Sequence, residues 1–196
     1  ARIVVDKQID YEFNNPVMES EFYEKPIMTS AYQQTKWFQI SAESINGYLS
    51  SIGKDPYRLN VIYYYSGDYD DEIWSSANNT DQVVNYFGPN GLGYIPATPG
   101  ETGSFVEYDN YELELLDKIS HEPGYILQNR DHGWYSFWDC PKFESKNVPT
   151  LTNHGKLPFV LSINCATGAF DKDGCLAESL MRNEDKGAVG VLAATY

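Results

Sequence analysis

The 196-residue sequence has few cysteines, few positive charges and no long hydrophobic run. Its three cysteines, Cys140, Cys165 and Cys175, argue against a disulfide framework, so at least one thiol is free or paired with another chain. Lys and Arg number 14 against 28 Asp and Glu, which gives a net charge of −14. A chain of this charge with no basic stripe should repel nucleic acid and anionic membranes, so nucleic-acid binding is set aside.

Further absences narrow the range of functions. All apolar runs fall far short of the ~20 residues that a membrane-spanning helix needs, so we expect no membrane span. No signal peptide is visible before the helical pattern that starts near Ala1, and we expect any leader or pro-segment to lie outside this sequence. No Cys or His pair has the C-x2-C or H-x3-H spacing of a zinc site.

The composition is that of a folded soluble protein, with 42% hydrophobic and 21% charged residues. The length suits one domain or slightly more and is enough for a hydrophobic core. The acidic surface suits cationic partners such as Lys- or Arg-rich peptides, or calcium. The simpler interpretation is that the negative charge only maintains solubility.

Hydrophobic periodicity and turn residues predict an α/β domain. Helices are expected over residues 2–13, 33–52, 80–87, 110–119 and 174–183, and strands over 27–31, 57–65, 124–130, 158–164 and 187–194. Thr80 and Gly53 are the expected N-terminal and C-terminal caps of their helices. The Gly- and Pro-rich stretch 88–104 is predicted to be a long surface loop. The final strand–helix–strand pattern, with apolar runs buried on both faces, indicates a parallel sheet.

One expected helix has a distinct apolar pattern. In the segment 33–52, apolar residues recur at spacings of three and four: Trp37, Ile40, Ile45, Tyr48, Leu49 and Ile52. This pattern predicts a helix over residues 33–52.

Two reactive side chains directly follow strands of the expected sheet. His132 comes after the strand 124–130, and Cys165 after the strand 158–164. Ligands of parallel sheets bind beyond the carboxyl ends of the strands, so the two side chains can approach if these strands are neighbours. A thiol needs a base such as imidazole to form thiolate near neutral pH. The backbone N–H groups of Gly133 and Cys165 are candidates for an oxyanion hole.

Other interpretations of the same residues stay open. A cysteine at a strand end is usually a small buried hydrophobe, and a lone histidine in a loop is usually exposed. A disulfide between Cys165 and Cys175 would abolish nucleophilic catalysis. His121, His154, Cys140 and Cys175 are weaker candidates because none of them directly follows an apolar strand.

Two ordered motifs resemble gingipain-type cysteine peptidases, which are secreted enzymes of Bacteroidetes-like bacteria. The stretch Gln128–Gly133, with the later Trp138, Asp139 and Pro141, resembles the segment around the catalytic histidine of that family. The stretch Ser162–Gly168 resembles its nucleophile segment. The following helix and strand are also similar, through the residues Cys175–Glu178, Arg182 and Gly187–Thr195. The resemblance covers most of residues 27–196.

The resemblance implies a caspase-like three-layer α/β domain with a mostly parallel central sheet flanked by helices. It also implies an extracellular or surface endopeptidase that cleaves after a basic residue at P1, the substrate residue whose carbonyl is attacked. His132 and Cys165 would form the dyad, and the intermediate would be a thioester acyl-enzyme. No cofactor is required for this chemistry, although structural calcium is common in such proteins.

The family also uses an acidic residue to orient the histidine or to line the S1 pocket, which holds the P1 side chain. Candidates are Asp131 and the run Asp70, Asp71 and Glu72. This run can equally be a solvated or calcium-binding loop.

The family's catalytic domain extends beyond both ends of this sequence. We therefore expect residues 1–196 to be part of a gingipain-like catalytic domain, with a possible second chain supplying the missing C-terminal part. The expected partner is a peptide or protein substrate. Two alternatives remain: a catalytically inactive caspase-like binding or adhesin module, and a thiol enzyme that transfers the acyl group to an amine.

Overall fold

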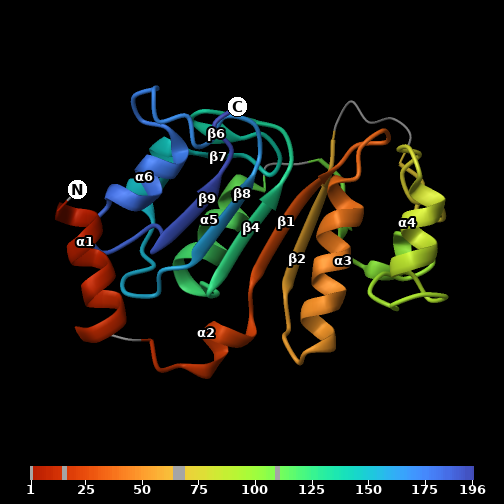
Figure 1. Ribbon diagram of the computed structural model, residues 1–196, viewed down its shortest axis with the longest axis horizontal. Helices are drawn as coiled ribbons and strands as arrows, with labels where there is room; N and C mark the ends of the chain where they lie inside the picture. Colours follow the sequence, from red (N-terminus) through yellow and green to blue (C-terminus); the bar gives the residue numbers. More distant parts are fainter. Residues whose placement is uncertain (1, 15–16, 64–68, 109–110) are drawn as a thin grey trace.

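A six-stranded parallel sheet forms the centre of the molecule in the computed structural model, which describes residues 2–14, 17–63, 69–108 and 111–196 (Figure 1). The strand order is β3-β2-β1-β4-β8-β9 and all adjacent strands are parallel. The strands are β1 (Ile27–Tyr32), β2 (Tyr57–Ile62), β3 (Phe105–Val106), β4 (Ile126–Arg130), β8 (Phe159–Ile163) and β9 (Gly190–Ala193). The five strands predicted from sequence are confirmed: β1 is one residue longer than expected, and β2, β4, β8 and β9 are shorter.

Helices lie on both faces of this sheet, so the predicted three-layer α/β class is confirmed. The described helices are α1 (Arg2–Ile9), α2 (Ser20–Glu24), α3 (Phe38–Ser51), α4 (Thr80–Phe87), α5 (Glu112–His121) and α6 (Leu176–Arg182). Helix α3 covers the face that carries Asn60, while α5 and α6 pack on the opposite face, against Leu127 and Val160. Short helical turns span Asp10–Asn14, Gly100–Thr102 and Ser145–Thr150.

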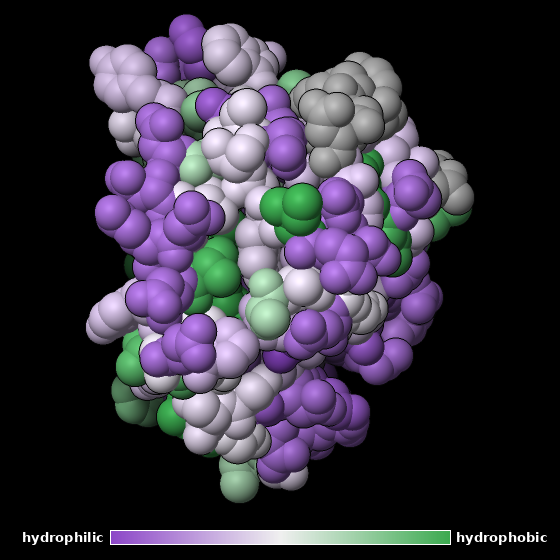
Figure 2. Space-filling view, turned by 90° about the vertical axis from the view of Figure 1, so that its right-hand side faces the viewer, coloured by the Kyte–Doolittle hydropathy of each residue, from purple (hydrophilic) through white to green (hydrophobic). Residues whose placement is uncertain are grey.

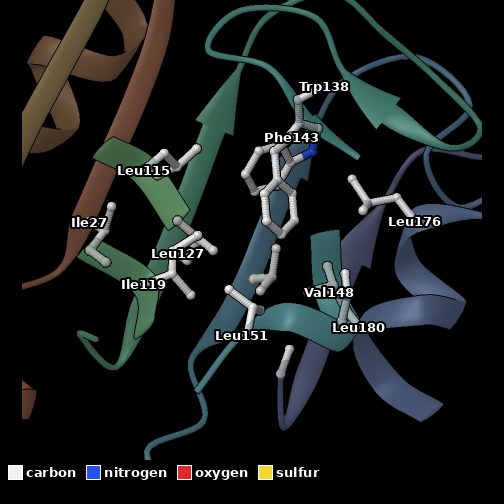
Figure 3. Packing of buried hydrophobic residues seen from close by; sticks show 12 residues of the cluster. Ile27, Leu115, Ile119, Leu127, Trp138, Phe143, Val148, Leu151, Leu176 and Leu180 are labelled. Carbon is white, nitrogen blue, oxygen red and sulfur yellow. The ribbon is translucent and has the colours of Figure 1, made fainter. Parts of the chain in front are cut away.

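The main hydrophobic core lies between the sheet and helices α5 and α6 (Figure 3). Leu115 and Ile119 of α5 pack over Leu127 of β4. A small antiparallel sheet closes the top of this core and consists of β5 (Gly133–Trp134), β6 (Phe137–Trp138) and β7 (Phe143–Glu144). Trp138 and Phe143 are fully buried, and burial of each stabilises the fold by roughly 1.5–3 kcal/mol. The core therefore anchors the segment that directly follows β4.

The helix predicted from this spacing is present as α3, and its buried residues include the polar Gln39, Glu43, Ser44 and Asn46. Only Ile40 and Leu49 of the expected apolar face are buried, whereas Ile45, Tyr48 and Ile52 are 37%, 49% and 52% exposed. The exposed part of this stripe lines a groove of about 550 Å³ between α3 and α4. Periodicity alone identifies an apolar stripe but not the element against which it packs.

Glu43 is the centre of the polar layer between α3 and the sheet. Its carboxylate is 1% exposed and accepts hydrogen bonds from Asn60 at 2.6 Å, Asn46 at 3.0 Å and Ser104 at 3.2 Å. The Arg58 guanidinium donates to the other carboxylate oxygen at 3.3 Å. A buried carboxylate with this many donors is satisfied without leaving the interior.

Several predicted boundaries differ from the structure, and three of the differences have a clear local cause. Helix α3 begins at Phe38 and not at residue 33, because residues before it form a turn in which the Lys36 N–H donates to the carbonyl of Gln33. The N-cap of α4 is Asn79, and the hydroxyl of Thr80 donates to the carbonyl of Ala77 instead of capping the helix. The first helical segment ends at Ile9 and continues as a π-type turn.

The surface around α4 and the following loop is mostly hydrophilic, with hydrophobic residues in small separate patches (Figure 2). Within the described ranges no helix is both long and apolar enough to cross a membrane.

Candidate active site

The sheet brings the two predicted catalytic segments together. Strands β4 and β8 are parallel neighbours, and their last residues, Arg130 and Ile163, pair in register. His132 and Cys165 each lie two residues beyond that pair, so they leave the same edge of the sheet side by side. The condition that the sequence left open, that these two strands are neighbours, is therefore met.

Asn164 joins the two segments directly. Its Nδ2 donates to the carbonyl of His132 at 3.1 Å, and its side chain is 3% exposed. Gly133 also packs against it, since a Cβ added at Gly133 would lie 2.9 Å from the Cβ of Asn164 and 2.9 Å from the carbonyl oxygen of Phe137. Only glycine allows this close approach. The sequence places Asn164 beside Cys165 but does not reveal this hydrogen bond.

Cys165 is a free and exposed thiol, and Cys140 and Cys175 are free and buried. The proposed Cys165–Cys175 disulfide is therefore absent. The next residue, Ala166, has a φ of 58°, a left-handed conformation that costs a non-glycine residue about 1–2 kcal/mol. Cys165 opens onto a cavity of about 640 Å³ whose other lining residues include Trp134, Tyr135, Phe170 and Tyr196.

The imidazole of His132 is half-buried among aromatic rings. The Phe38 ring meets it edge-to-face at 5.1 Å and the Tyr63 ring lies 6.0 Å away. Its Nε2 lies 2.8 Å from Oε1 of Gln33. Gln33 directly follows β1, which is the neighbour of β4 on the side opposite to β8. Among the residues that the structure describes, no hydrogen bond joins His132 to Cys165.

Burial lowers the pKa of His132, and the positive charges of Lys36 and Arg130 lower it further against an opposing effect of Asp139. The ring is therefore neutral at neutral pH. An amide oxygen can only accept, so Nε2 carries the proton in this arrangement and Nδ1 holds the lone pair. Gln33 was not predicted, because its contact with His132 spans 99 residues of sequence.

The backbone of Gly133 is oriented away from its partner strand. Residues in antiparallel strands alternate between hydrogen-bonded and non-hydrogen-bonded pairs. The N–H of Asp139 donates to the carbonyl of His132, so the neighbouring pair of Gly133 and Trp138 is non-hydrogen-bonded. The N–H of Gly133 thus points away from β6.

Asp131 supports the loop and does not contact the imidazole. Its side chain is 1% exposed and accepts hydrogen bonds from the Tyr63 hydroxyl and the Cys140 N–H. Burial raises the pKa of Asp131 to about 7, with a smaller upward effect of Asp139 and opposing effects of these hydrogen bonds. This residue therefore fixes the position of the segment that carries His132.

The acidic run lies after β2, separated from β4 by β1. Asp70, Asp71 and Glu72 are exposed. Asp70 accepts a hydrogen bond from the Glu72 N–H at 2.8 Å, and the carbonyl of Asp71 accepts one from Gly100. Asp68, also part of this run, lies outside the described residues. No group of three His, Cys, Asp or Glu side chains within the described ranges is arranged to hold a metal ion.

The weaker candidates have other partners. His121 pairs with Asp117 on α5, and His154 pairs with Asp185. Burial raises the pKa of the Cys140 and Cys175 thiols, which disfavours their thiolates.

Arg130 is a further charged residue at the site that the sequence reasoning did not select. Its Nη1 donates to the carbonyl of Ile163 at 3.0 Å, and its guanidinium lies 4.4 Å from the centre of the Phe38 ring. Its position at the end of β4, two residues before His132, is the signal that would have identified it.

The model of peptidase family C25 matches the chain over residues 1–196. Two solved structures are similar: a complex of Porphyromonas gingivalis RgpB pro- and mature domains, and the Arg specific cysteine proteinase gingipain R (RGPB). Each is 19% identical, with a TM-score of 0.57, and the match covers 99% of this chain and 37% of that chain. A third solved structure, described as a protease, is 18% identical and has a TM-score of 0.54. The match covers 96% of this chain and 32% of that chain. A comparison with curated proteins gave no match.

The chain thus spans about a third of the length of the solved relatives that it matches. The likeness to the gingipain structures confirms the predicted caspase-like fold.

Proposed function

Because the chain belongs to peptidase family C25, we propose that it is part of a cysteine endopeptidase with Cys165 as nucleophile and His132 as base. The observation that carries this proposal is the arrangement of the two segments beyond β4 and β8. Their strands pair in register. Asn164, the residue directly before the proposed nucleophile, donates a hydrogen bond to the carbonyl of His132.

In the proposed mechanism, Nδ1 of His132 accepts the thiol proton of Cys165 and the thiolate attacks the substrate carbonyl. The neutral state of the imidazole supports its role as base, because a protonated ring could not accept a proton. The tetrahedral intermediate expels the amine, which takes the proton from His132 and leaves a thioester on Cys165. Water then hydrolyses the thioester.

The oxyanion hole is proposed to consist of the N–H groups of Gly133 and Cys165. The direction of the Gly133 N–H away from β6 supports this role. Gln33 would hold the Nε2 proton, which leaves Nδ1 as the acceptor, although a neutral amide stabilises the imidazolium less than a carboxylate would.

The location and partners of the enzyme are inferred from the family. We propose an extracellular or surface enzyme whose substrate is a peptide or protein, with no cofactor required for the chemistry. Structural calcium and a second chain that completes the domain remain proposals. The basic P1 preference implied by the resemblance requires an acidic side chain within reach of the P1 residue.

A direct test combines turnover with labelling of the thiol. The wild-type protein should hydrolyse fluorogenic peptides and incorporate one equivalent of a thiol-reactive peptide probe. Cys165→Ala should lose both properties, and His132→Ala should lose turnover. His154→Gln, at an exposed histidine paired with Asp185, serves as the matched control and should retain both.

The outcomes separate the alternatives. Binding of a partner protein that persists in Cys165→Ala, without turnover or labelling in the wild type, would favour the inactive binding module. Products joined to an added amine in place of hydrolysis would identify acyl transfer.

A further inference from the structure

We propose that Arg130 recognises the P1 side chain and that the enzyme cleaves after acidic residues, Asp or Glu. This inference rests on the proposed function and goes beyond it, because it assigns a specificity-determining residue and a substrate class. It departs from the basic P1 preference that the family resemblance implies.

The guanidinium of Arg130 contacts the segment before Cys165 and the aromatic ring that packs against His132. It leaves the end of β4 on the sheet face that carries Ile163, and one of its nitrogens donates to the Ile163 carbonyl. The Phe38 ring lies under the guanidinium at 4.4 Å and meets the His132 ring at 5.1 Å. The pKa of Arg130 is lowered by burial and raised in part by the charge of Cys165, so the cation lies within electrostatic reach of the nucleophile. The P1 side chain is attached next to the carbonyl that Cys165 would attack, and Arg130 bonds the carbonyl of Ile163, two residues before Cys165.

The positive charge of Arg130 lacks a carboxylate partner. Across the described ranges no ion pair joins Arg130 to an Asp or Glu. Asp131 is near enough to affect its pKa, but the carboxyl oxygens of Asp131 are occupied by the Tyr63 hydroxyl and the Cys140 N–H. A guanidinium has five N–H donors in a planar fork that matches a carboxylate, and among the described residues one hydrogen bond, to Ile163, uses them. A half-buried arginine with free donors is therefore suited to a substrate carboxylate.

Other charges near the site also favour an acidic P1 side chain. The ammonium of Lys36 is close enough to lower the pKa of His132, which adds a second positive charge on the Phe38 side. In the cavity on the Trp134 side, Lys172 forms an ion pair with Asp171 at 3.2 Å, so these two charges offset each other. A lysine or arginine at P1 would therefore meet unpaired positive charge, which disfavours its binding.

None of the acidic candidates from the sequence supplies the missing negative charge within the described residues. Asp131 is buried and fully engaged, and its pKa near 7 leaves it partly neutral. Asp70, Asp71 and Glu72 are exposed, and the hydrogen bonds observed at Asp70 and Asp71 come from the N–H groups of Glu72 and Gly100. Within the described ranges, none of these four carboxylates forms a hydrogen bond with Arg130.

The test measures kcat/KM of the full protein on peptides that differ only at P1: Asp, Glu, Asn, Gln, Lys and Arg. Asn and Gln match the acidic residues in shape and lack the charge. The wild type should prefer Asp or Glu over Asn or Gln by about ten- to a hundredfold, the range expected for a hydrogen-bonded charge pair. Arg130→Gln should abolish that ratio, and Arg130→Glu should shift the preference to Lys or Arg.

A matched control removes the same charge elsewhere. Lys54 lies beyond the C-terminal end of α3, and its ammonium is over the ring of Tyr125. Tyr125 directly precedes β4, so Lys54 lies at the end of the sheet opposite to His132 and Cys165. Lys54→Gln should leave the P1 preference as in the wild type. A preference that changed equally in both variants would reflect net charge alone and would contradict the role of Arg130.

Two results would overturn the inference while leaving the proposed function intact. The first is Cys165-dependent cleavage with a preference for Lys or Arg, or with equal rates for Asp and Asn. The second is an Arg130→Gln variant in which all peptides slow by the same factor and the alkylation of Cys165 shifts to higher pH. That pattern would mean that Arg130 stabilises the thiolate. Absence of both cleavage and labelling in the wild type would instead refute the proposed function, and this inference with it.

Discussion

The side-chain amide of Asn164 donates a hydrogen bond to the backbone carbonyl of His132 at 3.1 Å. The residue before the nucleophile thus holds the backbone of the general base, and the two proposed catalytic residues are coupled through one buried side chain. Their relative position therefore depends on a residue that has no part in bond breaking.

Loss of this bond should reduce turnover more than stability. In Asn164→Ala, the His132 segment loses its link to the nucleophile, and we expect kcat to fall by about ten- to a hundredfold, since small misplacements of reacting groups are costly. The melting temperature should fall by only a few degrees, in keeping with one lost hydrogen bond of about 1 kcal/mol. Steady-state kinetics and calorimetry measure the two effects. Asn183→Ala removes a similar amide bond to the Ser179 carbonyl and should retain activity.

A carboxylate in place of Gln33 should shift the pH dependence of catalysis. In Gln33→Glu, a negative charge next to Nε2 favours the imidazolium, so the pKa of His132 rises. The acidic limb of the kcat/KM profile, where the base becomes protonated, should therefore move to higher pH. Gln33→Ala lacks the hydrogen bond without adding charge, so its rate should fall without that shift. An unchanged profile in Gln33→Glu would show that His132 is not oriented through Nε2.

Asp131 should make the folded state less stable as pH rises from about 4 to 7. Its folded-state pKa is about 7, against an ordinary value of 3.8, so the folded state holds a proton in this window that the unfolded state has lost. Stability falls as pH rises where the folded state binds more protons. The full difference corresponds to roughly 4 kcal/mol at most. Urea unfolding at pH 4.5 and 7.5 measures it.

The Asp131→Asn variant tests the assignment of this effect. It has no titrating group at that position, so its stability should vary less between the two pH values than that of the wild type. An identical pH dependence in both proteins would assign the effect to other groups.

Removal of the Glu43 carboxylate should destabilise the fold strongly. In Glu43→Ala, the amides of Asn46 and Asn60 and the guanidinium of Arg58 lose their acceptor inside the protein. Breaking a buried charged network by deleting one partner costs about 3–5 kcal/mol, measurable by denaturant unfolding. Glu122→Ala removes an exposed carboxylate paired with Lys118 and should cost much less than Glu43→Ala. Equal costs in the two variants would contradict a stabilising role for the buried layer.

The sequence predicts the parallel strands and the two catalytic candidates because both signals are local. An apolar run followed at once by a reactive residue defines the end of β4 and of β8, and parallel pairing places both ends at one edge. The contacts of His132 with Gln33 and of Asp131 with Tyr63 join residues far apart in sequence, so no local pattern predicts them.

The sequence also identifies the apolar stripe of α3 without revealing its orientation. The polar residues Gln39, Glu43 and Asn46 have the same helical spacing on another face, and only the sheet's Asn60 explains why that face is buried. The spacing of residues identifies the polar and apolar faces of a helix. Which face is buried depends on the surface against which the helix packs.

The polar layer under α3 has a consequence for the site beyond β4. An apolar interface tolerates small sliding movements, whereas each donor around Glu43 must lie opposite its acceptor. The helix can therefore occupy one register along the sheet. Phe38 is the first residue of the same helix, and its ring contacts both His132 and Arg130. The hydrogen bonds of Glu43, more than one helical turn from Phe38, therefore help to position both the proposed base and the proposed P1-recognition residue. None of these bonds takes part in the proposed reaction.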